Sequence, residues 1–137
     1  MTADSVQEAA WGAEQLNRIG GAQELELASR RRDGSLRAFV TMWVVRVGGD
    51  VYVRSAYGAE NPWYRRAKAS GVGQIRAGGV ERDVVFAPAS AGVMDAIDAA
   101  YHAKYDRYGR QIVSHVVGPD AHRFTIRLVP AVPDHEE

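Results

Sequence analysis

The sequence predicts a small α+β domain, mainly β, built on an antiparallel barrel of about six strands with two or three flanking helices. Several segments alternate apolar and polar residues, as half-buried strands do. Tight-turn pairs separate these segments, namely Asp33-Gly34, Gly48-Gly49 and Gly78-Gly79. Closing an antiparallel sheet hides its edges, so we expect a partly open barrel. A chain of 137 residues suits a single domain over 1–137.

The N-terminal segment predicts a helix over residues 5–20. Ser5 and Glu8 have the spacing of a capping box, and apolar residues then recur at helical intervals. Gly20-Gly21 is expected to end this helix. The strict alternation over residues 24–29 predicts the first strand.

Residues 36–47 form the longest strand candidate. Both of its faces carry apolar residues, which predicts a central strand covered on both sides. Residues 51–55 are expected to return antiparallel to it. A short helix should then begin at Pro62 with Asn61 as its N-cap, and end near Ser70.

The second half of the chain predicts a hairpin, a helix and a final strand. The hairpin pairs residues 73–77 with 80–86, and the helix runs from Ser90 to just before Gly109. The pattern of residues 110–121 fits neither a strand nor a helix clearly. Residues 123–129 alternate again and predict the last strand.

Composition and charge narrow the class of protein. The proline-containing tail, 130–137, is expected to be frayed. No cysteine is present, no apolar run could span a membrane, and no signal peptide opens the chain, so we expect a cytoplasmic protein. Residues 30–82 carry a net charge of about +7, between segments of about −4 and −3. This excess suits a small anionic ligand, although the acidic segments could instead pack over it. The alternation of sign argues against nucleic acid.

The stretch 51–67 combines groups that hold phosphates. Arg54 and Ser55 end a strand, and Arg65 follows in the first turns of a helix whose N-terminus is itself favourable to anions. Arg37 could lie across the neighbouring hairpin. The aromatic residues nearby could provide flat apolar surface for a ring system: Trp43, Tyr57 and Trp63. The alternative is that Trp63 plugs the barrel end and the arginines are surface groups.

Other candidate sites are weaker. The four histidines have no metal-ligand spacing, so we expect no metal, and Asp95 and Asp98 are expected on a solvated helix face. Tyr101 and Lys104 fall on one side of a helix, as a catalytic pair would. They could equally be a packed ring beside a lysine whose ammonium reaches solvent.

Particular motifs carry a resemblance to a known family. The segments DGSLR, WVVRVGGDVYVRS, WYRRA, AGGVERDV and AYHAKY resemble the domain-of-unknown-function family 2255 over nearly the whole chain. The order of strands, the YVRS motif and the following glycine loop and helix resemble the wider split-barrel flavin- and deazaflavin-binding superfamily. Pyridoxamine phosphate oxidase-like proteins and deazaflavin-dependent nitroreductases belong to that superfamily.

The resemblance implies a split-barrel homodimer that binds FMN or a deazaflavin coenzyme at its interface. Mapped onto this chain, it implies phosphate contacts from Arg37, Arg54 and Ser55, with Tyr57 and Arg65 nearby. It places the cofactor ring against residues 41–43, which include Thr41 and Trp43. The superfamily lysine near the end of the second strand is missing here, where Val44-Val45-Arg46 stands.

We therefore expect hydride transfer between a flavin-type cofactor and a small organic substrate. Tyr101, Lys104 and Tyr105 are the candidates for the substrate side, as hydrogen-bond donors or a proton source. A cofactor-free binding protein is the alternative, or an isomerase- or cyclase-type enzyme using the same pocket for an anionic or aromatic molecule.

Overall fold

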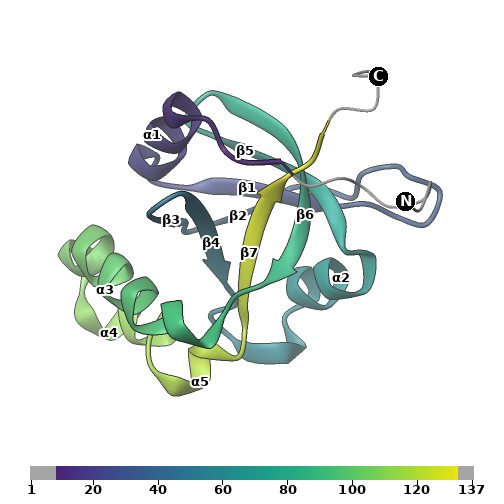
Figure 1. Ribbon diagram of the computed structural model, residues 1–137. Coiled ribbons are helices and arrows are strands. Elements are labelled where there is room, and N and C mark those ends of the chain that lie inside the picture. Colours follow the sequence, from purple (N-terminus) through teal and green to yellow (C-terminus); the bar gives the residue numbers. More distant parts are fainter. Residues whose placement is uncertain (1–8, 133–137) are drawn as a thin grey trace.

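The computed structural model describes residues 9–132 (Figure 1). Within them, one antiparallel sheet contains seven strands: β1 Leu25–Ser29, β2 Val40–Met42, β3 Val45–Val47, β4 Asp50–Arg54, β5 Val72–Ala77, β6 Val80–Pro88 and β7 Thr125–Pro130. Five α-helices accompany it: α1 Ala13–Gly21, α2 Pro62–Ser70, α3 Met94–Tyr105, α4 Arg110–Val113 and α5 Pro119–His122. The predicted α+β class is confirmed.

The sheet has the order β2-β1-β5-β6-β7-β4-β3, so its two end strands are neighbours in the sequence. Trp43 and Val44 alone separate β2 from β3. The sheet therefore curls until its first and last strands meet at this two-residue break. A long strand divided in this way explains why seven strands form where about six are predicted.

The prediction that residues 36–47 form one central strand is wrong. Its two halves are the edges of the sheet, with β2 paired to β1 and β3 paired to β4. At the break, the Val44 N–H donates to the Tyr105 hydroxyl (3.0 Å), and the Lys104 ammonium donates to the Val44 carbonyl (2.8 Å). Side chains of α3 thus satisfy the buried peptide groups that a neighbouring strand would otherwise pair.

Apolar residues on both faces of the strands build two cores. Along β4, Val51 and Val53 belong to the core within the curled sheet, while Tyr52 belongs to a second core beneath α3. The first core also includes residues of α1 and α2, and the second includes Tyr101 and Tyr105 of α3. In Figure 1, α3, α4 and α5 gather on one side of the sheet, away from α1. The apolar pattern of residues 36–47 reflects these two cores.

The N-terminal helix is shorter than predicted. It begins at Ala13, and residues 9–12 are not helical, while Ser5 and Glu8 lie outside the described residues. The Ala9 N–H donates to Pro130 O (2.7 Å), and the buried Trp11 indole donates to Leu128 O (2.9 Å). These bonds hold the segment before the helix against β7, so the helix starts only after Gly12.

The prediction of a frayed tail over 130–137 is wrong for its first residues. Pro130 ends β7 opposite Val84, and the buried Ala131 donates its N–H to Asp83 O (2.9 Å). The nine-residue strand β6 is long enough to pair with this segment. Residues 133–137 lie outside the described part of the chain.

Other predicted elements are confirmed. Helix α2 starts at Pro62 and ends before Gly71, whose φ of 78° is the left-handed conformation that glycine adopts readily. Residues 110–121, whose pattern fits neither a strand nor a helix clearly, contain α4 and most of α5, with a 3₁₀ turn at Ser114–Val116 between them. Among the described residues, no helix is long and apolar enough to cross a bilayer.

Gly73 is expected to be essential for packing within the sheet. A Cβ at Gly73 would collide with the Ala28 carbonyl of β1 and the Phe86 ring of β6. We expect Gly73→Ala to lower the free energy of unfolding by about 1–3 kcal/mol, as overpacking does. Urea unfolding followed by tryptophan fluorescence measures this change. Gly49→Ala is the control, because a Cβ there meets no atom within 4 Å. Equal midpoints for the two variants would contradict the prediction.

Candidate functional site

Two hollows meet at the N-terminus of α2. The first, here called the Trp43 pocket, has a volume of about 310 Å³. Its lining includes five of the residues predicted to bind a cofactor: Thr41, Trp43, Arg54, Tyr57 and Trp63. Asn61, Ile112 and His115 complete much of the wall. Strands β2 and β4, the start of α2 and the segment before α5 therefore converge on one pocket.

The indole of Trp43 is held in place from behind. Its ring stacks on Tyr105 with centroids 4.1 Å apart and planes inclined by 7°. Tyr105 is itself anchored, because its hydroxyl accepts the Val44 N–H and lies 2.8 Å from Gln23 O. Burial raises the pKa of this hydroxyl to about 12, so it keeps its proton at neutral pH. Tyr105 therefore supports the pocket from outside instead of facing a ligand in it.

The other two aromatic residues of the pocket differ in exposure. Trp63 is 7% exposed and belongs to the core within the sheet, so it plugs that end of the core and also forms the pocket wall. Tyr57 is 74% exposed and stands at the rim, with its ring 5.7 Å from the His115 ring. Trp63 therefore plugs the core, as one reading of the sequence predicts, and contact with a ligand ring stays a prediction.

Arg54 reaches the pocket, but its donors are used inside the protein. Its side chain is 0% exposed and donates to Thr125 Oγ1 (2.8 Å), to Val116 O (2.7 Å) and to the Asp98 carboxylate. These bonds tie β4 to β7, α3 and the turn before α5. Arg54 consequently shapes the wall of the pocket and offers little free charge to a phosphate.

Ser55 is likewise engaged within the protein. Its side chain is buried, its hydroxyl donates to Gly58 O (2.7 Å), and it does not line the Trp43 pocket. The serine therefore stabilises the loop between β4 and α2. The phosphate contacts expected from Arg54 and Ser55 have no geometric support in this structure.

Asp98 is not the solvated residue that the sequence suggests. Its side chain is 21% exposed, and its carboxylate accepts from Arg54 and the Gly118 N–H (3.1 Å) and lies 2.9 Å from His122 Nε2. Burial by itself would raise the pKa of Asp98, but the hydrogen bonds from Arg54, His122 and Gly118 outweigh it and hold the pKa below its usual value. A helix pattern cannot reveal a partner from a distant strand.

The Asp98 region has the residue types of a metal site, although Asp98 and His122 already bond to each other. Asp95, Asp98 and His122 each offer an atom, and these atoms lie within 4.8 Å of one another. The guanidinium of Arg54 already stands against Asp98 as its positive partner. A cation would have to displace a buried arginine, so the cluster is better explained as an ion pair with a histidine attached.

The second hollow, here called the arginine groove, lies between the 30–37 hairpin and α2 and encloses about 1060 Å³. Six arginines line it: Arg30, Arg31, Arg32, Arg37, Arg65 and Arg66. Arg30 bonds to Asp83, and Arg31 bonds to Ser35 and the Leu36 carbonyl. Among the described residues, the side chains of the other four make no hydrogen bond or ion pair. The groove is therefore a concentrated positive surface.

Neighbouring residues at the start of α2 line the two hollows. Asn61 and Trp63 line the Trp43 pocket, while Pro62 between them lines the arginine groove. On the opposite side, Thr41 lines the pocket and Arg37 lines the groove. A molecule with an aromatic ring and an anionic arm could occupy both hollows at once.

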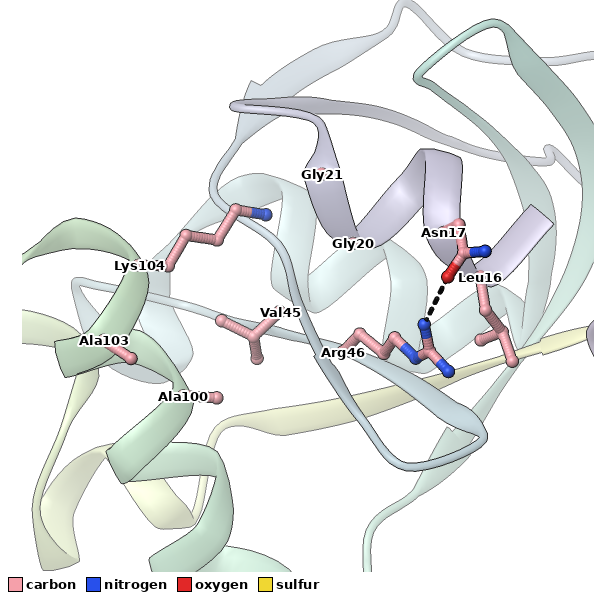
Figure 2. A pocket seen from close by; sticks show the side chains of 9 residues that line it. All are labelled: Leu16, Asn17, Gly20, Gly21, Val45, Arg46, Ala100, Ala103 and Lys104. Atoms are coloured by element: carbon pink, nitrogen blue, oxygen red, sulfur yellow. Dashed lines mark hydrogen bonds between the residues drawn. The ribbon is translucent and has the colours of Figure 1, made fainter. Parts of the chain in front are cut away.

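The predicted substrate-side residues lie elsewhere. Tyr101 is fully buried, its hydroxyl has no hydrogen-bond partner among the described residues, and burial raises the pKa of that hydroxyl. Lys104 lines a third hollow between α1, α3 and β3 (Figure 2), apart from the Trp43 pocket. Lys104 and Tyr101 thus do not line the Trp43 pocket, although the guanidinium of Arg54 lies 5.6 Å from the centre of the Tyr101 ring.

Sequence reasoning also missed residues of the pocket wall. Ile112, His115 and Val116 come from the segment that showed no clear periodicity. Short helical turns there bury Val113 and Val116 and leave Ile112 53% exposed. No local signal distinguishes such residues from those of an ordinary loop.

The ion pair between Arg54 and Asp98 is expected to contribute strongly to stability. We expect Asp98→Asn to lower the free energy of unfolding by about 3 kcal/mol, because it leaves a buried guanidinium without its anion. Since the pKa of Asp98 is lowered in the folded state, this contribution is present above about pH 4 and is lost on further acidification. Urea titrations at neutral and acidic pH measure both effects.

The control for this pair is Asp95→Asn, because Asp95 is exposed on the same helix. We expect that variant to change stability by no more than about 0.5 kcal/mol. A similar loss in both variants, or a gap that persists unchanged below about pH 4, would contradict the role given to Asp98.

Solved structures share this fold at low sequence identity. An F420 reductase is 20% identical, with a TM-score of 0.51, covering 91% of this chain and 97% of its own. The heme storage protein HutZ from Vibrio cholerae is 13% identical, with a TM-score of 0.58 and coverage of 91% and 93%. An FAD-binding protein from Mesorhizobium loti is 11% identical, with a TM-score of 0.53 and the same coverage. Identities this low show the fold alone.

The family is shown by the sequence itself. No curated protein matches this chain. The family described as "Uncharacterized protein conserved in bacteria (DUF2255)" matches over residues 15–128, which is most of the chain. The curled antiparallel sheet, its helices and the structural neighbours agree with that match. This protein belongs to the DUF2255 family.

Proposed function

We propose that this protein binds FMN or a deazaflavin coenzyme and transfers hydride between it and a small organic substrate. One observation carries the proposal: the start of α2 contributes to both an aromatic pocket and a groove with six arginines, four of which have no side-chain partner among residues 9–132. The structural neighbours that are described as an F420 reductase and an FAD-binding protein support the same cofactor class.

The residues present fit such a cofactor. Trp43 and Trp63 offer flat apolar surface to a ring, and Thr41 of β2 lines the same pocket. Arg37 and Arg65 would hold the phosphate from opposite walls of the groove, with Arg32 and Arg66 nearby. When bound, either cofactor would supply a ring that accepts or donates hydride.

In this proposal, the side chains that line the pocket orient a ligand and shield it from water. Tyr105 fixes the orientation of the Trp43 indole, so the pocket wall is rigid before any ligand arrives. Arg54 and Asp98 hold the opposite wall, which comes from β4 and the turn before α5. His115 and Tyr57 stand at the mouth and are the polar groups best placed to meet a substrate.

A homodimer is part of the proposal. Tyr57 and Ile112 are large side chains at the rim of the Trp43 pocket, and they are 74% and 53% exposed. A second copy packed against this rim would bury them and exclude water from the pocket. Analytical ultracentrifugation of the wild type and of Ile112→Asp tests it, since a charge there should shift a dimer towards monomer.

Binding of the cofactor phosphate is expected to depend on the arginine groove. We expect the wild type to bind FMN or the deazaflavin coenzyme, and Arg37→Gln and Arg65→Gln each to weaken that binding by about tenfold, or 1.4 kcal/mol. Riboflavin lacks the phosphate, so its affinity should change little in these variants. Fluorescence titration with FMN, riboflavin and the deazaflavin coenzyme measures these differences.

Lys68→Met is the matched control, because Lys68 is an exposed cation of α2 that does not line the groove. It should leave FMN affinity unchanged. If the protein binds neither FMN nor the deazaflavin coenzyme, the redox proposal is wrong and the cofactor-free alternative remains. Equal losses of FMN and riboflavin affinity would instead contradict the placement of the phosphate.

A further inference from the structure

The third hollow, here called the α1–α3 cavity, has a volume of about 500 Å³ and is lined by residues of α1, α3 and β3. Figure 2 shows Lys104 reaching from α3 towards the Gly20-Gly21 end of α1, with Val45 below it. Arg46 extends from β3 towards Asn17 on the far side. Small and apolar side chains form the rest of the lining: Leu16, Ala100 and Ala103.

Two cations and no acidic side chain line this cavity. Its lining includes Lys104 and Arg46 and no aspartate or glutamate. Among the described residues, the Lys104 ammonium has one hydrogen-bond partner, the Val44 carbonyl (2.8 Å). An ammonium has three donors, so two remain. Within residues 9–132, Arg46 bonds to neutral groups alone, namely Asn17 Oδ1 (2.9 Å) and Gly48 O (2.8 Å).

We propose that the α1–α3 cavity is a second ligand site, which binds a small organic carboxylate through Lys104, while Arg46 adds positive charge to the opposite wall. The carboxylate would accept the remaining donors of the half-buried ammonium, and an apolar body would lie against Leu16, Val45 and the alanines of α3. The site is separate from the Trp43 pocket and does not depend on a cofactor. The chemistry that selects its ligand is one anionic head on an apolar body.

The electrostatics of Lys104 give this site a measurable signature. Burial, with a smaller effect of the Arg107 charge, lowers the pKa of Lys104 to about 8. Other charged or titratable groups near it are Arg46 on β3, the neighbouring Tyr105, and Glu24, whose charge acts on the Tyr105 hydroxyl; α1 adds the neutral Asn17 to the lining. A bound carboxylate favours the ammonium form, so it should raise the pKa of Lys104. Affinity should accordingly fall as the pH rises through 8.

The chain contains only two lysines, Lys68 and Lys104, which makes a direct test possible. Incorporation of ¹³C-lysine would make both side chains visible by NMR without changing their chemistry, and Lys68→Arg assigns the signals. We expect benzoate to shift the Lys104 signal and raise its pKa, with no change at Lys68. The apparent affinity should drop by up to about tenfold per pH unit above the pKa of the free protein.

Variants separate this site from unspecific effects of charge. Lys104→Met, which keeps the apolar stem, should weaken benzoate binding by about tenfold or more, measured by calorimetry, whereas Lys104→Arg should retain most of it. Lys68→Met should bind like the wild type. The Lys104 signal is measured in the wild-type protein, so the test remains possible even if a Lys104 variant is unstable.

Two results would overturn the proposal. One is a Lys104 signal and pKa that stay unchanged while benzoate, butyrate and cyclohexanecarboxylate are titrated to high concentration. The other is an equal response to chloride or phosphate, which would reduce the effect to screening of charge without a site for an organic carboxylate.

Discussion

The two-residue break at Trp43 and Val44 is the constraint on which the rest of the structure depends. Its buried peptide groups are satisfied by Tyr105 and Lys104 of α3, not by a strand. The chain can therefore change from pairing with β1, as β2, to pairing with β4, as β3, without leaving backbone polar groups unpaired. Unpaired backbone polar groups would be costly in a core. Because the break joins the two ends of the sheet, it both closes the curled fold and attaches α3 to it.

The same break organises the hollows of the molecule. Trp43 faces the Trp43 pocket and stacks on Tyr105, while Val45, two residues later, forms part of the α1–α3 cavity. Both residues pack in the core beneath α3, and each also borders a different hollow, so one short segment serves two separate sites. Lys104 donates a hydrogen bond to the Val44 carbonyl and lines the α1–α3 cavity, whereas Tyr105 beside it supports the Trp43 pocket.

Much of the candidate site was predictable because it comes from one continuous stretch. A strand end, a glycine loop and a proline-initiated helix bring Tyr57, Trp63 and Arg65 to one region by local geometry alone. Arg54 was misjudged because its partner Asp98 lies 44 residues away on α3. An arginine that is neutralised in the fold and one that remains available look alike in a sequence. The pocket wall from Ile112 to Val116 was also missed, since short helical turns have too few residues to show a period.

The sequence by itself determined the elements that depend on neighbours in the chain. Glycine turns, alternating apolar residues and the proline start of α2 act over a few residues, and the structure agrees with them. The tertiary structure alone decided which strands are edges, where the long strand breaks, and which charges are paired. Those outcomes rest on contacts such as Val44 with Tyr105 and Arg54 with Asp98, between residues dozens of positions apart. Burial and pairing arise only when the chain folds, so no local pattern can encode them.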